Sequence, residues 1–377
     1  MVENLGANTN LMKVLFLGLK IFSTGGIEQV CKNWLYALSS LSTKNNSSFH
    51  AISLYDTEID NRYVNSTSIK VCSGNKYKFG IHAIWKAITS DVVIIPHLNL
   101  SLFVLIAKLI NPKIKVFVQL HGIEAWTNLS GVQERMLNQA DGILSVSNFT
   151  MNNVLERYPH LKSKSSVLSN SLDPLKDYNT DIDAGINFRS SKGIAESKKL
   201  LITVGRLHNE EAYKGYDKTI EAIHLLNDES IEFHIIGKYD KIEQQRIFDM
   251  LLKYDMVGQV KLVGYVNDED LAKYYHAADL FIMPSKGEGF GLVFIDAMAN
   301  GLRVIGGNAD GSVDAISFSS ESALINPDDI EEIKNAIQKL LSENWTAEQK
   351  INLSTKCKEK FSPEIFEHNI EKTILWK

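Results

Sequence analysis

The sequence predicts an α/β protein with two doubly wound, parallel-sheet domains. Short, nearly continuous apolar runs alternate with segments of helical periodicity, a pattern typical of parallel strands that are covered by helices on both faces. The alternation stops in a polar stretch over residues 173–196 and then starts again. The length of 377 residues also suits two domains of about 150 residues or more.

The first half begins with an apolar run at residues 13–19, which we expect to be a strand. A glycine loop, Ser23-Thr24-Gly25-Gly26, and a helix over residues 27–41 follow it. The further expected strands cover residues 50–55, 91–97, 115–121 and 142–147. The helices between the later strands are expected over residues 81–88, 101–110, 131–140 and 150–158.

The second half repeats the pattern, beginning with a strand over residues 199–204. The next strands are expected at residues 232–236, 260–263, 280–283 and 303–305, and the clearest helices at residues 217–226 and 269–278. From Asp328 onward the pattern is helical, with an interruption at Pro363. The expected domains are therefore residues 1–172, a linker or crossing over 173–196, residues 197–355, and a C-terminal helix over 356–377 that packs back toward the N-terminal domain.

The composition excludes several classes of protein. The net charge of −5 argues against a general nucleic-acid binder, although residues 1–175 carry 16 basic and 11 acidic side chains. Cys31, Cys72 and Cys357 match neither a zinc site nor a disulfide framework, which favours a reducing compartment. The first apolar run, residues 11–22, contains Lys13 and Lys20, so we interpret it as a core strand and expect a cytoplasmic protein without a signal peptide or membrane span.

The densest group of chemically useful residues follows the strand at residues 280–283. Gly287, Gly289 and Gly291 allow a ligand to approach the backbone closely, and the helix that starts after them favours an anion at its N-terminus. Glu288 lies in this loop and Asp296 lies about two turns into the helix. Since carboxylates accept hydrogen bonds from hydroxyl groups, the pair suits a sugar or a ribose beside a phosphate.

A pair of cations follows the strand at residues 199–204. Arg206 comes directly after the strand end and Lys214 lies in the loop beyond it. Two cations at this edge suit a diphosphate, and ordinary surface charge is an equally good interpretation of the pattern alone. The loop over residues 23–28 resembles a phosphate loop but lacks the Lys-Ser/Thr of a Walker motif and the full Gly-x-Gly-x-x-Gly pattern, which argues against an ATPase and against standard NAD binding.

His121 ends the strand at residues 115–121, where it could donate a hydrogen bond to a ligand or act as a base; alone, a structural histidine is the commoner case. Asp181-Ile182-Asp183 looks like an Asp-x-Asp metal motif but lies in the polar linker, so we expect solvated carboxylates there. The sequence has no Gly-x-Ser-x-Gly motif. We therefore expect neither a metal site nor a serine hydrolase.

Taken together, these motifs resemble a known family. Glu288 to Asp296, with Gly-Phe-Gly-Leu between them, resembles the Glu-x7-Glu motif of the retaining glycosyltransferases of family 4, which have the two-domain GT-B fold. The resemblance extends along nearly the whole chain, in the family's order. Its further elements are Gly25-Gly26-Ile27-Glu28, His121-Gly122, residues 140–147, Asn170 with Asp173, Gly205-Arg206, Lys214-Gly215 and residues 278–281.

The resemblance implies a role for each of these positions. Arg206 and Lys214 would neutralise the diphosphate of a nucleotide-sugar donor, Glu288 would bind hydroxyls of the transferred sugar, and Asp296 would hold the ribose. His121 would contact the donor sugar near the reacting carbon. Gly25 and Gly26 would let the donor and the acceptor approach closely, and the stretch around Lys238 and Tyr265 would border the nucleobase. Backbone amides near Gly291, Leu292 and Val293 would support the diphosphate. The other implied donor-binding residues are Gly237, Gly289 and Phe290.

Two positions depart from the family pattern. Asp296 stands where the family usually has a longer glutamate, and the loop at residues 306–311 differs from the usual small-residue loop. Both differences put the donor preference in doubt.

The function implied is retaining transfer of a hexose-type sugar from a UDP- or GDP-linked donor to a saccharide or lipid-linked saccharide, in the synthesis of a surface polysaccharide such as lipopolysaccharide or of another glycoconjugate. The resemblance implies no metal ion and no other cofactor. The alternatives are a GT-B epimerase or phosphorylase, and a non-catalytic subunit that binds a sugar nucleotide.

Lysines and aromatic residues are interleaved over residues 76–86, in a segment of helical periodicity. This pattern suits peripheral contact with an anionic membrane, here the inner face of the cytoplasmic membrane, and also suits an ordinary helix packed on the sheet. A lipid-linked acceptor would fit the first interpretation.

Overall fold

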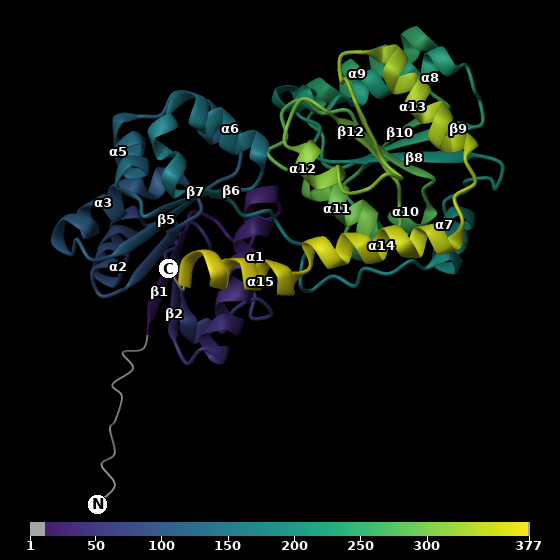
Figure 1. Cartoon of the computed structure of the whole chain (residues 1–377). Coiled ribbons are helices and arrows are strands. Elements are labelled where there is room, and N and C mark those ends of the chain that lie inside the picture. The colour runs from purple at the N-terminus through teal and green to yellow at the C-terminus, as the bar shows by residue number, and fades with distance from the viewer. Residues whose placement is uncertain (1–11, 376–377) are drawn as a thin grey trace, which may run out of the picture. The chain divides into compact units, whose positions relative to one another are not determined.

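The computed structural model describes residues 12–375, and these form two compact units (Figure 1). Of the described residues, unit 1 contains 12–146, 151–175 and 363–375, and unit 2 contains 147–150 and 176–362. Each unit is a parallel sheet covered by helices, so the predicted fold class is confirmed. None of the helices between residues 12 and 375 is long and apolar enough to cross a bilayer.

The sheet of unit 1 has seven parallel strands in the order β3-β2-β1-β4-β5-β6-β7 within the described residues. The order reverses between β1 and β4, as in doubly wound sheets. Its strands are β1 (Lys13–Gly18), β2 (Ser48–Ser53), β3 (Ile69–Val71), β4 (Val92–Ile95), β5 (Lys115–Leu120), β6 (Gly142–Ser145) and β7 (Ser165–Val167).

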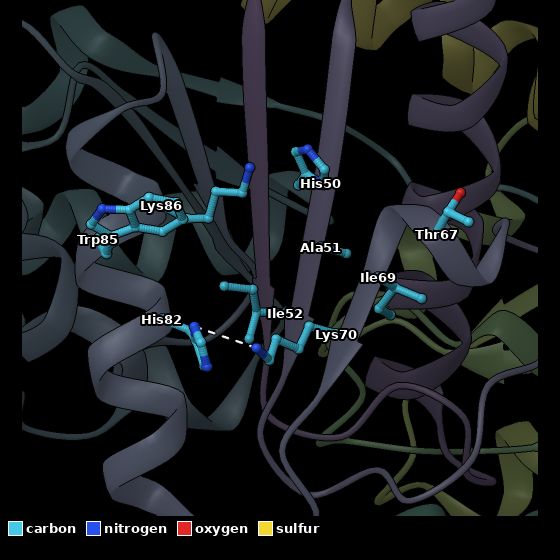
Figure 2. Close-up of a pocket in the computed structure, with 9 residues that line it drawn as sticks. All are labelled: His50, Ala51, Ile52, Thr67, Ile69, Lys70, His82, Trp85 and Lys86. Carbon is cyan, nitrogen blue, oxygen red and sulfur yellow. Dashed lines mark hydrogen bonds between the residues drawn. The ribbon is translucent and has the colours of Figure 1, made fainter.

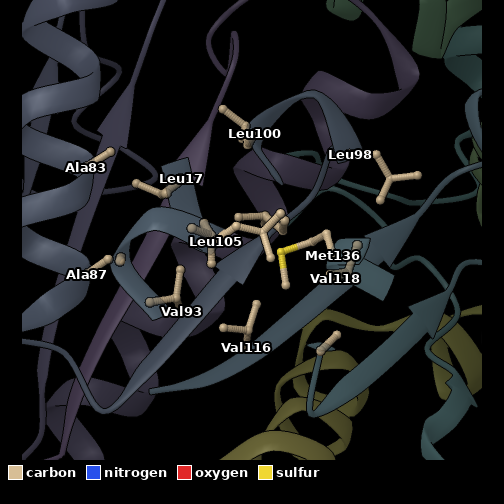
Figure 3. Packing of buried hydrophobic residues seen from close by; sticks show 14 of the residues in the cluster. Leu17, Ala83, Ala87, Val93, Leu98, Leu100, Leu105, Val116, Val118 and Met136 are labelled. Atoms are coloured by element: carbon tan, nitrogen blue, oxygen red, sulfur yellow. The ribbon is translucent and has the colours of Figure 1, made fainter. Parts of the chain in front are cut away.

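Helices cover both faces of this sheet, and alternate side chains of β1 show why. Leu15 and Leu17 join the core under α2 (Lys76–Ile88), α3 (Ser101–Ile110) and α5 (Gly131–Gln139), part of which is drawn in Figure 3. Phe16 points to the opposite face and packs on Trp34 of α1 (Gly26–Lys44). The remaining helices of unit 1 are α4 (Ile123–Trp126), α6 (Asn148–Arg157), which starts in residues grouped with unit 2, α15 (Pro363–Ile370) and short helical turns at Ser66–Ser68, Leu98–Leu100, Pro159–Lys164 and Glu371–Leu375.

The last helix of the chain, α15, packs against the first, α1. The Phe366 and Trp34 rings meet edge to face with centroids 5.4 Å apart. Lys44 at the end of α1 forms an ion pair with Glu367 at 2.5 Å. Segments from the two ends of the sequence therefore share the core of unit 1.

The sheet of unit 2 has six parallel strands in the order β10-β9-β8-β11-β12-β13 within the described residues. The strands are β8 (Lys199–Val204), β9 (Ile231–Ile236), β10 (Val260–Gly264), β11 (Leu280–Met283), β12 (Val304–Gly307) and β13 (Ala323–Ile325). The central strands β8, β9 and β11 are almost wholly buried, as expected for a sheet with helices on both faces.

The helices of unit 2 also lie on both faces of their sheet. One layer contains α8 (Tyr216–Leu226), α9 (Lys241–Tyr254) and α13 (Ile330–Ser342), whose apolar residues share a core with Leu280 and Ile282. On the other face, Phe281 packs edge to face on Phe294 of α11 (Leu292–Ala299). The remaining elements are α7 (Ile182–Ser191), α10 (Asp268–Ala277), α12 (Ser312–Ile316), α14 (Ala347–Phe361) and a 3-10 segment at Asn209–Lys214.

The predicted linker at residues 173–196 contains the helix α7. Asp181 and Asp183 are exposed, as expected for solvated carboxylates, and Asp181 also caps α7 by accepting the Ala184 amide at 2.8 Å. An added Cβ on Gly185 would lie 2.5 Å from the His276 carbonyl oxygen, so α7 lies directly against the end of α10. The helix depends on these contacts and not on a strong apolar stripe of its own.

Candidate active site

In unit 2, the loops that follow β8, β9 and β11 meet at the carboxyl edge of the sheet. Their backbones lie so close that side chains would not fit between them. An added Cβ on Gly237 would lie 1.8 Å from the Gly205 carbonyl oxygen, and one on Gly215 would lie 2.3 Å from the Pro284 carbonyl oxygen. Gly215 also has a left-handed φ of 74°, which glycine adopts without strain. Ligands of such sheets bind at this edge.

The two predicted cations, Arg206 and Lys214, come together here around one carboxylate. Arg206 Nη2 lies 2.6 Å from Glu211 Oε1, and Lys214 Nζ bonds the other oxygen of Glu211. The Arg206 side chain is 73% exposed, while that of Lys214 is 11% exposed. Glu211 thus occupies the position between the cations that an anionic ligand would take.

Glu288 lies in the neighbouring loop, half-buried. Burial raises the pKa of its carboxyl group, and the nearby Asp310 adds to the effect, while Lys214 opposes it. The site therefore holds an acid that resists ionisation beside a cation, and such perturbed groups in a loop at the sheet edge are typical of functional sites.

Asp310, in the loop after β12, holds this acidic loop in place. It is 1% exposed, and it accepts hydrogen bonds from Ser285 Oγ at 2.8 Å, the Glu288 amide at 2.8 Å and the Ser312 amide at 2.9 Å. Burial raises the pKa of this carboxyl group as well. An added Cβ on Gly311 would lie 2.0 Å from the Gly289 carbonyl oxygen, so the two loops pack backbone to backbone.

The first turn of α11 follows Gly291, whose φ of 85° again suits glycine. Leu292 and Val293 begin the helix, and its amide groups give this end a partial positive charge. Phe290, by contrast, is buried and packs edge to face on Phe361 with centroids 5.7 Å apart. Its side chain therefore supports the loop from behind.

Asp296 has partners of its own within unit 2. Its Oδ2 lies 3.1 Å from Lys176 Nζ, and its Oδ1 accepts the Tyr178 hydroxyl at 2.7 Å. Both carboxylate oxygens of Asp296, the residue predicted to bind the ribose, are thus engaged by the segment before α7. Lys238 and Tyr265, predicted near the nucleobase, lie together, with Lys238 Nζ 5.2 Å from the centroid of the exposed Tyr265 ring.

The predicted residues of unit 1 lie at the carboxyl ends of β1 and β5. Gly25 precedes α1 with a φ of 156°, and an added Cβ there would lie 2.1 Å from Glu28 Oε2. A Cβ on Gly26 would meet no atom within 4 Å. The glycine loop therefore leaves open space at its second glycine, with the Glu28 carboxylate next to the first.

His121 follows β5 and is 8% exposed. Its amide donates to Glu124 Oε1 at 2.5 Å, and its ring interacts with the Pro96 carbonyl, while the buried Nε2 has no hydrogen-bond partner among residues 12–375. Burial lowers the pKa of the ring, and the neighbouring His97 lowers it further. A neutral ring with Nε2 as a free acceptor can bind a ligand hydroxyl.

Several functional candidates were missed by the sequence analysis. Glu211 lies between the two predicted cations, and Asp310 lies in the loop noted for its departure from the family pattern. His97 follows β4 by two residues, and His121 comes directly after β5; a second histidine just past a strand end was a usable signal. Over residues 12–375, no three His, Cys, Asp or Glu side chains are placed so that they could hold a metal ion.

Part of unit 2 matches a known protein family. Residues 186–360, which include every predicted site residue of unit 2, match the family described as "Glycosyl transferases group 1". An uncharacterised glycosyltransferase of Methanocaldococcus jannaschii is 27% identical over 216 residues, 57% of this chain and 54% of that protein. A sulfoquinovosyl transferase of Arabidopsis thaliana is 30% identical over 43% of this chain and 30% of that protein. The chain thus spans about half, or less, of these curated relatives.

Solved structures share the fold over nearly the whole chain. The Anabaena protein HepE, determined in complex with UDP, superposes with a TM-score of 0.78 at 18% identity, covering 97% of this chain and all of that one. The lipopolysaccharide outer core galactosyltransferase WaaB superposes with a TM-score of 0.69 at 15% identity, covering 97% of this chain and 99% of that one. These similarities show the GT-B fold for this chain.

Proposed function

We propose that this chain is a group 1 glycosyltransferase that moves a hexose-type sugar from a UDP- or GDP-linked donor to a saccharide or lipid-linked saccharide. The observation that carries the proposal is the cluster of Arg206, Lys214 and Glu288 at the carboxyl edge of the unit 2 sheet. The family match covers this cluster, and HepE, which has the same fold, is bound to UDP in its crystals.

Arg206 and Lys214 would bind the donor diphosphate. In the structure both cations pair with the single carboxylate of Glu211, so a diphosphate would replace one negative charge with a group of higher charge. As the bond between the anomeric carbon and the diphosphate breaks, negative charge grows on the leaving group. Two fixed cations and the first turn of α11 would stabilise that charge as it develops.

Glu288 would bind hydroxyl groups of the transferred sugar. Its carboxyl oxygens can accept hydrogen bonds from those hydroxyl groups, and Asp310 fixes its backbone by accepting its amide. Asp310 is thus a positioning residue in this proposal. No carboxylate here is assigned as a covalent nucleophile, and we propose attack from the face that the diphosphate leaves, so that the sugar retains its configuration.

His121 would accept a sugar hydroxyl through Nε2, the buried nitrogen that has no partner within residues 12–375. Gly26, with open space beside it, would leave room for a substrate. Because Lys176 and Tyr178 engage both of its oxygens, Asp296 would bind the ribose by exchanging one of these partners, or would act on the ribose through them. We propose that this exchange accompanies donor binding and that Lys238 and Tyr265 border the base.

The acceptor is proposed from the names of relatives. A serotype-specific mannosyltransferase of Escherichia coli is 28% identical over 35% of this chain, and WaaB shares the fold. We propose an acceptor that belongs to a surface polysaccharide or glycolipid, and that the transfer takes place at the cytoplasmic face of the membrane. No added metal ion or cofactor is required in this proposal, because the cations of the chain itself face the leaving group.

The proposal is tested by incubating the purified chain with UDP- and GDP-linked hexoses and measuring the nucleoside diphosphate released, with chelator present. One donor class should be hydrolysed slowly without acceptor, and Arg206→Ala should reduce release by about 100-fold, as for loss of one group that stabilises a transition-state charge. Equal release by wild type and Arg206→Ala would contradict the proposal.

A further inference from the structure

A hollow of about 240 Å³ lies in unit 1 between α2 and the two outer strands β2 and β3. Figure 2 shows its lining, with His50 on β2, Lys70 on β3, and His82, Trp85 and Lys86 on α2. His50 is near the amino end of β2, whereas the loops described above follow the carboxyl ends of the strands. The hollow is therefore separate from the residues to which the proposed function assigns donor binding.

The titratable groups that line this hollow are all basic. Lys70 Nζ lies 3.5 Å from His82 Nδ1, and no carboxylate in the described part of the chain forms an ion pair with Lys70 or Lys86. Burial and Lys86 lower the pKa of His50, while burial, Lys70 and Lys78 lower that of His82. Four basic groups from three elements thus face one another without an acid, and this arrangement favours an anion.

An apolar stripe runs along α2 beside the hollow. Tyr77, Ile81 and Trp85 are 88%, 69% and 62% exposed, and their four-residue spacing puts them on one side of the helix. The opposite side, with Phe79 and Ala83, is buried against the core. Trp85 belongs both to the stripe and to the rim of the hollow, so the apolar and the cationic surfaces are continuous.

The neighbouring helix α3 has an exposed apolar stripe of its own. The α2 and α3 helices pack through Phe79 and Phe103, whose rings meet edge to face at 5.2 Å. On α3, Leu102, Ile106 and Leu109 are exposed, at the spacing of one helical face. Exposed apolar patches beside positive charge are typical of membrane-binding surfaces, and tryptophan is enriched at the membrane–water interface.

We infer that this surface, made of the hollow and the exposed stripes of α2 and α3, docks on an anionic phospholipid membrane, with a lipid phosphate in the hollow. Charge complementarity selects the anionic headgroup, and the apolar stripe selects a lipid surface over a soluble phosphate. The inference rests on the proposed function in one respect, because a lipid-linked acceptor gives the docking a purpose. The docking itself needs only the surface residues of unit 1.

The test is flotation of the whole chain with phosphatidylcholine vesicles, with and without phosphatidylglycerol. The wild type should float with the anionic vesicles and be released by high salt. Each lysine near an anionic surface changes partitioning about fivefold, so Lys70→Gln with Lys86→Gln should weaken binding about 30-fold. Trp85→Ser should also weaken it. Matched controls in unit 2 are Lys218→Gln with Lys334→Gln, and Leu252→Ser for the exposed apolar residue; neither should change flotation.

Two further readouts separate the possible failures. Release of nucleoside diphosphate from a soluble donor should be equal in the wild type and in the Lys70/Lys86 variant. If the wild type released none, that result would contradict the proposed function and not the membrane inference. Proton NMR of the histidines should show the pKa values of His50 and His82 rising with short-chain phosphatidylglycerol. Failure of the wild type to bind anionic vesicles would overturn the inference. A rise of the His50 and His82 pKa values with inorganic phosphate, without vesicle binding, would overturn it as well. Binding to RNA with no vesicle binding would overturn it too.

Discussion

Replacing Lys214 with methionine should separate the charge of the proposed diphosphate site from its packing. Methionine retains the aliphatic stem, which lies over Gly205, where an added Cβ would be 3.2 Å from Lys214 Cδ. The substitution removes only the ammonium group, which is paired with Glu211 and lies close enough to Glu288 to lower the pKa of that carboxyl group. Lys214 is also the better buried cation, 11% exposed against 73% for Arg206.

The expected magnitude follows from that burial. A charge-assisted hydrogen bond contributes about 1.5–3 kcal/mol, and 1.4 kcal/mol is a factor of ten in a dissociation constant. Lys214→Met should therefore weaken binding of the preferred nucleoside diphosphate about 10- to 150-fold. Arg206→Met should fall at the lower end of that range, because solvent screens an exposed pair more strongly.

The assay is isothermal titration of the wild type and the variant with UDP and GDP. Lys218→Met is the matched control, since Lys218 lies four residues further along the chain and makes only a 3.9 Å surface pair with Glu221. The control should bind like the wild type. If Lys214→Met bound as tightly as Lys218→Met, the assignment of Lys214 to the diphosphate would be wrong.

Three other substitutions should change ligand affinity or stability, and not all in the same direction. Glu211→Gln should bind the nucleoside diphosphate more tightly, by titration, because a competing carboxylate is removed from Arg206 and Lys214. Glu288→Gln should lose transfer activity and yet melt at a higher temperature than the wild type at pH 7. Because the pKa of Glu288 is raised in the folded protein, ionisation of this carboxyl group destabilises the fold as pH rises above the ordinary glutamate range. The difference in melting temperature between Glu288→Gln and the wild type should therefore vanish toward pH 4 in thermal melts. Asp310→Asn should lower the free energy of unfolding by about 1–3 kcal/mol in urea titrations, since an amide cannot accept all three hydrogen bonds, and should reduce activity; unchanged stability would contradict the positioning role.

Much of the fold follows from the amino-acid pattern because the central strands are buried on both faces. The expected strands at residues 199–204 and 280–283 coincide with β8 and β11, and the expected helix at residues 101–110 coincides with α3. The outer strands β3, β7 and β13 were missed, since each has three residues and at most one of them is buried. Such strands form because a neighbouring strand offers unpaired backbone groups, and no apolar run in the local sequence predicts this pairing.

The sequence predicted the main residues of the candidate site, but it predicted fewer of the contacts between them. Arg206, Lys214 and Glu288 lie in motifs whose order along the chain is informative. The contacts of the Asp310 carboxylate beneath the acidic loop depend on two loops packing against one another, since Glu288 and Asp310 are 22 residues apart. Glu211 lies within five residues of both cations, so its pairing with them depends on how the short 3-10 segment at Asn209–Lys214 folds. The lysine and the tyrosine that hold Asp296 come from 120 and 118 residues earlier in the chain, respectively. Distances of this kind are set by tertiary packing and not by local pattern.

The most direct measurement is a thermal-shift screen of the whole chain against UDP, GDP and ADP, with chelator present. A ligand that binds only the folded protein stabilises it by about 2.7 kcal/mol at a hundredfold excess over its dissociation constant, or about 5–10 °C for a unit the size of unit 2. One of the three nucleoside diphosphates should give this shift, and Lys214→Met should reduce it while Lys218→Met leaves it intact. If the folded protein shifted with none of them, or if Lys214→Met shifted as far as the wild type, the edge of the unit 2 sheet would not be a nucleotide-sugar site.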